Sequence, residues 1–236
     1  MYDVLDGFKY DNIHTREYAM RLIDRNVPSP TEKEIIENIP FMQGTLDFSM
    51  MLGERVYENR PLTYVFEIYE RKRETRKVSD TVLKNWLIRK GILPLYDDYD
   101  RGYYWLAKCT GVNITDDHRG GRLIIEITFD AYPLKKAQRE EGHDIWDEFN
   151  FDLDLSQDVE FTVDNTRVVT LINSGSAGVS PAILADGDFT IIKNNITYHI
   201  NSGETKSEMF RLEIGENKLT INGNGTIKFI FYKELI

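Results

Sequence analysis

The chain has 236 residues, of which 41% are hydrophobic and 12% aromatic. That is enough apolar material for one large β domain or two domains of ordinary size and too much for a disordered chain. Its 39 acidic and 29 basic residues give a net charge of −10. Because such a surface repels phosphate and anionic lipid, we exclude proteins that grip nucleic acid, although not proteins that DNA passes without being held.

Cysteine usage and the start of the chain indicate a reducing compartment. The single cysteine, Cys109, cannot build an internal disulfide framework or a cysteine-rich metal site, and we interpret it as a small buried hydrophobe. No apolar run approaches the ~18 residues of a membrane-spanning helix, and the first residues lack the pattern of a secretory signal. We therefore expect a protein made and folded in the cytoplasm, with no membrane partner.

Two segments of the first half predict strands with one buried face, because apolar side chains recur at every second position. In residues 62–68 the core-facing side chains are Leu62, Tyr64, Phe66 and Ile68. In residues 122–131 they are Leu123, Ile125, Ile127, Phe129 and Ala131. The turn "DHRGG" before the second strand predicts that it pairs with the segment "YYWLAKCTGVNI".

The segment "VSDTVLKNWLIRKG" predicts the one good helix. Ser79 is expected to cap its start and Gly91 to end it in the left-handed conformation. An apolar stripe is expected to lie on a sheet; it consists of Val82, Leu83, Trp86 and Leu87.

Residues 134–150 are densely charged and break the β pattern, so they indicate a connection between two domains. We place the first domain at 1–135, the connection at 136–155, in part helical, and the second domain at 156–236. The second domain has short runs rich in β-forming residues, separated by turn-like segments. The runs "VEFTV", "RVVTLI", "DFTII", "ITYHI", "MFRLEI", "NKLTI" and "TIKFIFY" predict a small β-sandwich, with "NGNG" as one of the turns.

No motif points to catalysis. The cluster Asp97, Asp98 and Asp100 stands among aromatics as a sugar site would, but neighbours in one turn cannot straddle a glycosidic bond. The four histidines match no zinc spacing, and neither a G-x-S-x-G elbow nor a phosphate-binding loop is present. We predict no catalytic residues, no metal and no cofactor.

Taken together, several segments resemble the distal tail protein family of long-tailed, non-contractile phages and prophages of Gram-positive bacteria. In the first half these are "GTLDFSMMLGERVYENRPLTYVFEI", "VLKNWL", "LPLYDDYDRGYYWLAKCTGV" and "LIIEITFDAYP". In the second half they are "NSGSAGVSPAILADGD" and "LEIGENKLTINGNGTIKFIFYKE". No piece is specific alone; the shared order carries the resemblance, over about residues 40–133 and 168–236.

The resemblance implies a mainly β fold: an N-terminal β-sandwich-type domain with one packed helix that forms a ring, and a C-terminal galectin-like or carbohydrate-module-like sandwich. It implies a non-catalytic hub ring, a hexamer by family expectation, at the distal end of the tail tube. Its partners would be other copies, the tail tube protein and the tail-tip or baseplate proteins. DNA would pass through without being bound. The protein would be made in the host cytoplasm and reside in the virion.

Two sets of residues are candidates for contact with partners. For the ring, we consider Tyr57, Asn59 and Arg60, since the planar fork of an arginine suits an interface. The alternative is a tail protein that binds host cell-wall saccharide. Its candidate stacking groups are Tyr96, Tyr99, Tyr103, Tyr104 and Trp105.

Overall fold

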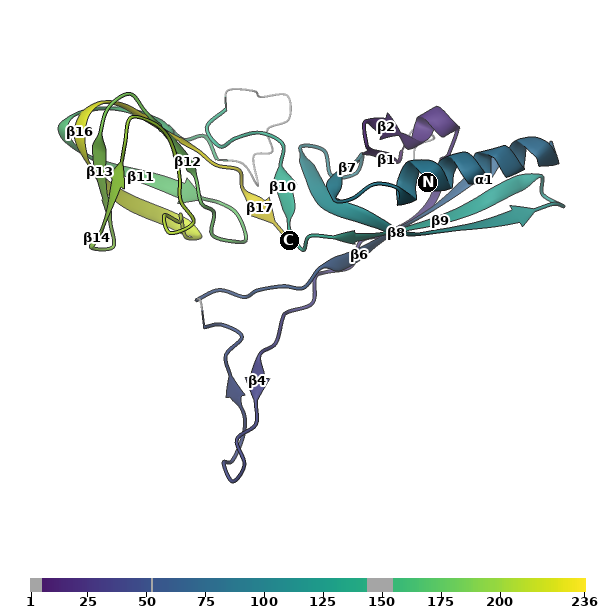
Figure 1. The fold of residues 1–236 in the computed structure, drawn as a ribbon, viewed down its shortest axis with the longest axis horizontal. Coiled ribbons are helices and arrows are strands. Elements are labelled where there is room, and N and C mark those ends of the chain that lie inside the picture. The colour runs from purple at the N-terminus through teal and green to yellow at the C-terminus, as the bar shows by residue number, and fades with distance from the viewer. Residues whose placement is uncertain (1–5, 52, 144–154) are drawn as a thin grey trace. The chain divides into compact units, whose positions relative to one another are not determined.

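The computed structural model describes residues 6–51, 53–143 and 155–236. It divides into two compact units, Met1–Lys135 with Ile236, and Lys136–Leu235 (Figure 1). Most of the predicted connection, residues 144–154, lies outside the described residues. Within the described part, no helix combines the length and apolarity needed to cross a bilayer. The fold is mainly β with one α-helix among the described residues, as predicted.

The first unit is built on one curved antiparallel sheet with the strand path β2-β1-β7-β8-β9-β6-β3. Its strands are β1 (Phe8–Tyr10), β2 (Ile13–His14), β3 (Arg21–Asn26), β6 (Arg60–Tyr69), β7 (Leu93–Asp97), β8 (Tyr103–Asp117) and β9 (Arg122–Ala131). A short 3-10 turn, Thr15–Tyr18, follows β2. The predicted strands at 62–68 and 122–131 are confirmed as β6 and β9, and β8 pairs with β9 as expected, with a bulge between Cys109 and Gly111.

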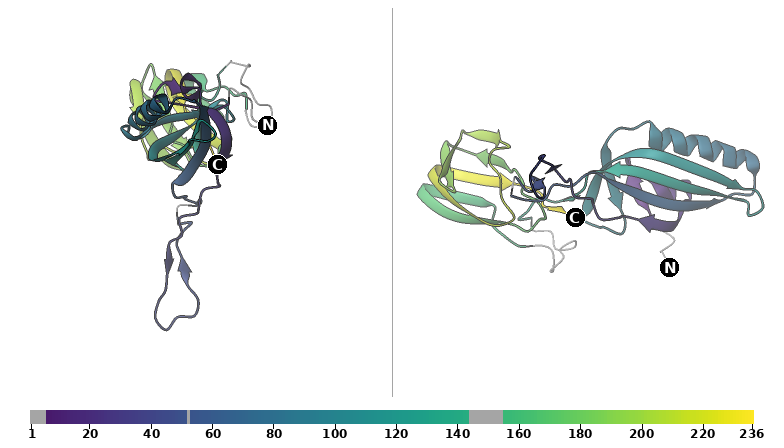
Figure 2. Two further views of the ribbon diagram at one scale, coloured as in Figure 1. Left: turned by 90° about the vertical axis from the view of Figure 1, so that its right-hand side faces the viewer. Right: turned by 90° about the horizontal axis from the view of Figure 1, so that it is seen from below.

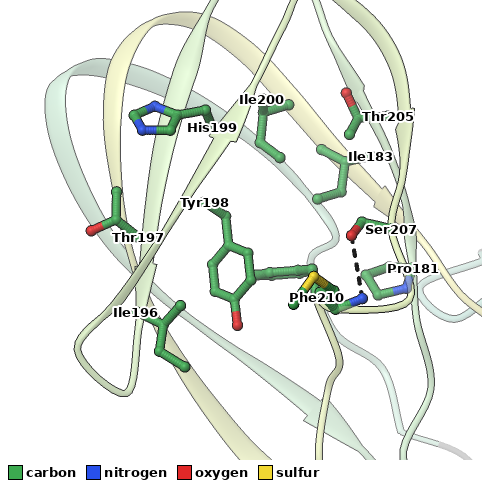
Figure 3. Close-up of a pocket in the computed structure, with 11 residues that line it drawn as sticks. Pro181, Ile183, Ile196, Thr197, Tyr198, His199, Ile200, Thr205, Ser207 and Phe210 are labelled. Carbon is green, nitrogen blue, oxygen red and sulfur yellow. Dashed lines mark hydrogen bonds between the residues drawn. The ribbon is translucent and has the colours of Figure 1, made fainter.

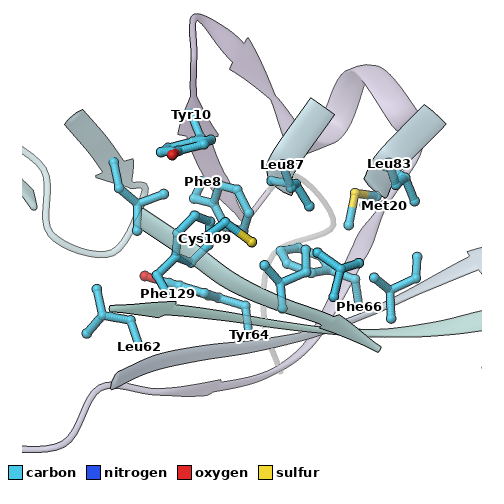
Figure 4. Close-up of a cluster of buried hydrophobic side chains, with 14 of the residues drawn as sticks. Phe8, Tyr10, Met20, Leu62, Tyr64, Phe66, Leu83, Leu87, Cys109 and Phe129 are labelled. Carbon is cyan, nitrogen blue, oxygen red and sulfur yellow. The ribbon is translucent and has the colours of Figure 1, made fainter. Parts of the chain in front are cut away.

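The core of this unit lies between the sheet and helix α1 (Arg73–Ile88), and strand β1 closes over it (Figure 4). The predicted inward faces of β6 and β9 are buried. Phe8 of β1 joins them, with ring centroids 5.0 Å from Tyr64 and 5.3 Å from Phe129. Cys109 is buried in the same cluster, as predicted.

Helix α1 differs from the prediction at both ends. It begins at Arg73, and its N-cap residue Lys72 makes no side-chain capping bond, so Ser79 lies inside the helix. Arg76 explains the earlier start: its buried guanidinium bonds the carbonyls of Glu70 and Arg71 and pairs with Asp116 at 2.6 Å. This anchor is a tertiary contact, which helical periodicity does not reveal. At the other end, the C-cap is Arg89 in the right-handed conformation, so the predicted left-handed stop at Gly91 is wrong. The buried stripe is also narrower, because Val82 is 39% exposed.

Between β3 and β6 the chain forms a two-stranded arm, residues 29–59, which leaves the sheet in Figure 1. Its short strands are β4 (Ile36–Glu37) and β5 (Leu46–Asp47), paired antiparallel. Nearer the sheet, Glu32 bridges to Tyr57, and the N–H of Lys33 donates to the carbonyl of Val56 at 2.8 Å. No pattern in the sequence predicts this element.

The second unit is a β-sandwich built on one long ribbon, β11 (Glu160–Asn173) with β16 (Gly215–Ile230). Other strands are β12 (Ala182–Ala185), β13 (Phe189–Lys193), β14 (Ile196–Ile200) and β15 (Gly203–Lys206). These six strands are connected by hydrogen bonds in the order β14-β13-β16-β12-β15, and β11 pairs with β16 off this path. Two short strands, β10 (Lys135–Ala137) and β17 (Glu234–Leu235), also pair, and the N–H of Ala137 donates to the carbonyl of Lys233.

The ribbon corrects two predictions. "NGNG" is not a turn between strands, because β16 runs through it and stays paired with residues 163–166 of β11. Of "MFRLEI", only Leu212 forms an isolated bridge, to Val179. Within β16 the two halves have different neighbours, β13 at residues 220–223 and β12 at 227–230. The change coincides with Gly223 and Gly225, at φ 148° and 130°. A bend there lets one ribbon serve both layers of the sandwich around one apolar core (Figure 2).

Candidate interaction surface

The arm carries the largest run of exposed apolar side chains in the described chain. Ten large hydrophobic residues on it are more than a third exposed. They are Ile35, Ile36, Ile39, Phe41, Met42, Leu46, Phe48, Met50, Met51 and Val56. An exposed set of this size, separated from the core, is typical of a surface that a partner covers.

The arm keeps its shape through bonds between its own two strands. The N–H of Phe48 donates to the carbonyl of Ile35, and the N–H of Ile35 donates to the Ser49 hydroxyl, both at 2.8 Å. Asp47 accepts from the N–H of Ser49 at 2.9 Å. Hydrogen bonds from the Ser49 side chain and N–H lower the pKa of Asp47. The arm is therefore an ordered ladder that presents apolar side chains without burying them.

Phe41, near the tip of the arm, is the most exposed of these residues. Its side chain is fully exposed, and its backbone has φ 68°, in the left-handed region that bulky residues rarely adopt. A strained, exposed aromatic residue contributes nothing to the fold of an isolated chain. Such outliers concentrate at functional positions, so Phe41 is the residue of the arm that most clearly indicates a contact with another molecule.

The three residues predicted for the ring interface lie at the base of the arm. Tyr57 is half-buried beside Glu32, and Asn59 is exposed, with its Nδ2 donating to Oδ2 of Asp130 at 3.0 Å. Arg60 is 4% exposed. Its Nη1 donates to the carbonyl of Pro28 at 3.0 Å, and its guanidinium lies 4.0 Å from the centre of the Trp105 ring. An interface role for Tyr57 and Asn59 stays a prediction, whereas burial leaves Arg60 no surface for direct contact, which corrects that part.

The aromatic residues proposed for saccharide stacking do not form one platform. Trp105 and Tyr103 are 1% and 9% exposed and face the protein interior, so a sugar ring cannot stack on them. Tyr96 and Tyr104 are half-buried and pack on each other, with ring centroids 5.6 Å apart. Tyr99 is exposed, and the guanidinium of Arg25 lies 5.2 Å from its ring centre. The structure therefore removes two of the five candidates and leaves the saccharide alternative weaker.

The acidic cluster next to these aromatics ties the first unit together. Asp97 is buried, accepts a bond from the Tyr64 hydroxyl at 2.9 Å and pairs with Arg25 at 2.8 Å. Burial raises the pKa of Asp97, against the opposing effect of the bonds and the cation. Asp98 contacts His14 Nε2 at 3.0 Å, and Asp100 pairs with Lys135 at 2.7 Å. Each carboxylate has a structural partner, and Asp97 is buried and not solvated, so the cluster packs the first unit together.

The second unit has an apolar pocket of about 430 Å³ beside strands β14 and β15 (Figure 3). Tyr198 and Phe210 form its aromatic wall, in edge-to-face contact at 4.9 Å. Ile183 and Met209 add further apolar surface, and the described lining contains no Asp, Glu, Lys or Arg. No group of three or more possible metal ligands was found among the described residues. The lining of this pocket suits an apolar side chain better than it suits a catalytic site.

Comparison with known proteins finds a similar structure but no similar sequence. No family model matches the chain, and no curated protein matches it. Among solved structures, the Dit protein of phage SPP1 aligns over 98% of this chain and 99% of its own, with a TM-score of 0.66 and 13% identity. That protein is described as a paradigm of the hub adsorption apparatus in phages that infect Gram-positive bacteria. The activated baseplate of phage p2 aligns over 91% of this chain and 90% of its own at a TM-score of 0.36 and 9% identity, too weak to support an argument. The fold of this chain, over nearly its whole length, is the fold of the SPP1 Dit protein.

Proposed function

We propose that this chain is a distal tail protein, a non-catalytic hub subunit at the end of a siphovirus-type phage tail. Two independent lines support the proposal. The order of sequence segments resembles that family, and the full-length fold matches the SPP1 Dit protein. Each carboxylate of the acidic cluster is engaged in a structural contact, which agrees with a scaffold.

The observation that carries the proposal is the exposed apolar arm. A protein that acts alone in water gains nothing from ten exposed hydrophobic residues on an extended ladder. In a ring, each arm covers a different patch on the next copy, and a heterologous contact of this kind closes when the rotation per subunit divides a full turn. The family resemblance makes a hexamer the expected ring, with the tail tube protein and tail-tip or baseplate proteins as its neighbours in the virion.

The test compares self-association of the intact chain with that of two arm variants. Phe41→Gly removes the exposed ring and relieves the left-handed backbone, so the fold should be unharmed while association weakens. Gln43→Gly makes the same substitution at a neighbouring polar residue of the tip and should associate like the intact chain. Light scattering after size-exclusion chromatography and negative-stain imaging, both over a concentration series, would measure the assembly.

The proposal predicts closed rings for the intact chain at high concentration and a shift to monomers for Phe41→Gly. A monomer in dilute solution is compatible with a hub that closes only at high local concentration. Compact monomers at every concentration, including with the adjoining tail proteins added, would refute the ring. Equal association of the two variants would show that Phe41 is not part of the contact.

A further inference from the structure

The base of the arm lacks the main-chain hydrogen bonds that hold the rest of it. The last paired residues of β3 and β6 are Asn26 and Thr63, and pairing resumes where the N–H of Glu58 donates to the carbonyl of Thr31. In the described structure, no main-chain bond joins residues 27–30 to residues 59–62. Prolines contribute to this gap because they have no N–H to donate; they are Pro28, Pro30 and Pro61. We call these two segments the neck.

Side chains bridge the neck where the backbone does not. Arg60, at the start of β6, reaches across it and donates from Nη1 to the carbonyl of Pro28 at 3.0 Å. The same guanidinium lies 4.0 Å above the ring of Trp105, which is 1% exposed on strand β8. Beside it, Asn59 donates to Asp130 of β9 at 3.0 Å, at an exposed site. Residues 60–62 already belong to the sheet, because they pair with β9. Arg60 links the other segment of the neck, residues 27–30, to that sheet through its bond to Pro28.

The buried environment of Arg60 does not maximise the free energy of unfolding of the chain. The guanidinium is buried, and within the described residues it forms no ion pair with a carboxylate. Its Nε has no hydrogen-bond partner there, and neither has Nε1 of Trp105. Desolvation lowers the pKa of Arg60, with Asp100 opposing from a distance. Because a buried cation without a close counter-charge is costly, its presence indicates a geometric role in addition to packing.

We propose that Arg60 is a positioning residue that fixes the direction in which the arm leaves the sheet. Stacked on Trp105 and bonded to Pro28, it holds residues 27–30 in one orientation against the start of β6, which the sheet already fixes. The arm is then presented already ordered, which reduces the conformational entropy lost when it docks. Only the identity of what the arm contacts rests on the proposed function; the orientation of the arm is a property of a single chain.

The test measures arm orientation directly in the dilute, monomeric chain. Spin labels at Gln43→Cys on the arm and Lys108→Cys on β8 both occupy exposed positions of the first unit. The native Cys109 stays unlabelled, because burial raises its pKa to about 11. Pulsed dipolar spectroscopy should give a narrow distance distribution with Arg60 present. It should give a broad one in Arg60→Met, which keeps an aliphatic stem over Trp105 but loses the bond to Pro28.

Two further variants separate positioning from general damage. Arg101→Met removes an exposed arginine from the turn between β7 and β8 and should leave the distribution narrow. Arg60→Lys keeps the charge without the planar stack and should broaden the distribution, which provides a second reading if Arg60→Met does not fold. The melting temperature of Arg60→Met should equal or exceed that of the intact chain, because a buried unpaired cation has been replaced by an apolar group.

Self-association of the same variants completes the experiment. Arg60→Met should associate about tenfold more weakly, the scale of a lost pre-organisation. A narrow distribution in both Arg60 variants, or a broad one in the intact chain, would overturn the positioning role even if the chain forms rings. Broadening in Arg60→Met alongside an intact chain that never assembles would uphold the positioning role and refute the ring.

Discussion

Replacing Trp86 by alanine should remove a large part of the stability of the first unit. Trp86 is 6% exposed, and its ring lies 5.1 Å from that of Tyr18 and 6.1 Å from that of Phe8. Its Nε1 donates to the buried carbonyl of Tyr10 at 3.2 Å. Deleting a buried large aromatic costs about 3 to 5 kcal/mol, and a carbonyl left unpaired adds about 1 kcal/mol or more. We therefore expect Trp86→Ala to lie at the upper end of that range.

Two controls make the prediction specific. Trp86→Phe keeps a ring in the cavity and loses the bond to Tyr10, so it should cost about 1 to 2 kcal/mol. Val82→Ala lies one turn earlier on the exposed side and should cost about 0.5 kcal/mol. Urea unfolding, followed by tryptophan fluorescence in a Trp146→Phe background, would report on the first unit, whose core holds the remaining tryptophans. A free energy of unfolding for Trp86→Ala within ~1 kcal/mol of the intact chain would refute the packing of α1 on this core.

Three further predictions concern the connection, the ribbon and DNA. Limited proteolysis should first cut within residues 142–155. The two pieces should stay associated until denatured, because β10 lies in one piece and pairs with β17 in the other. A first cut inside residues 156–236 would contradict two separately folded domains. Gly225→Ala should lower the melting temperature of the second unit more than Gly215→Ala does. Both glycines have positive φ, but of the two only a Cβ at position 225 would collide with Asp186. Equal effects of the two substitutions would mean that the bend tolerates a side chain. The assembled protein should not shift labelled duplex DNA at ~0.15 M salt, because its net charge is −10, and a clear shift would contradict an unbound passage for DNA.

Periodicity predicted those elements of the first unit whose residues alternate between core and solvent. Phe66 and Ile125 lie on the inward faces of β6 and β9, as an alternating pattern requires. The same reasoning failed for the start of α1, because the buried guanidinium of Arg76 anchors it by pairing with the partly exposed Asp116, forty residues further along the chain. A single polar residue has no period, so sequence patterns cannot show that it is buried.

The second unit shows a different limit, which concerns glycine. Gly223 and Gly225 predict a turn because glycine supplies positive φ, and they do have positive φ. Yet the backbone at a hairpin turn and at a sharp bend of a continuous strand both need such residues. Only the partner strand decides between them, and here β11 pairs on both sides of the bend, from Glu160 to Asn173. The alternation of "NKLTI" and "TIKFIFY" was correctly identified as β, but the topology depended on long-range pairing.

The arm was missed because its residues satisfy no intramolecular pattern. An exposed ladder has no buried face, so its apolar residues need not alternate, and Ile35 and Ile36 are both exposed. Arg60 shows the converse: a charged residue at a strand start predicts exposure, while the structure buries it over Trp105. Under the two proposals both departures have one physical origin, since each residue would be placed for the contact that the arm makes and not for the stability of the isolated chain. On these proposals another copy covers the exposed apolar surface of the arm, and the buried guanidinium of Arg60 directs the arm toward that copy.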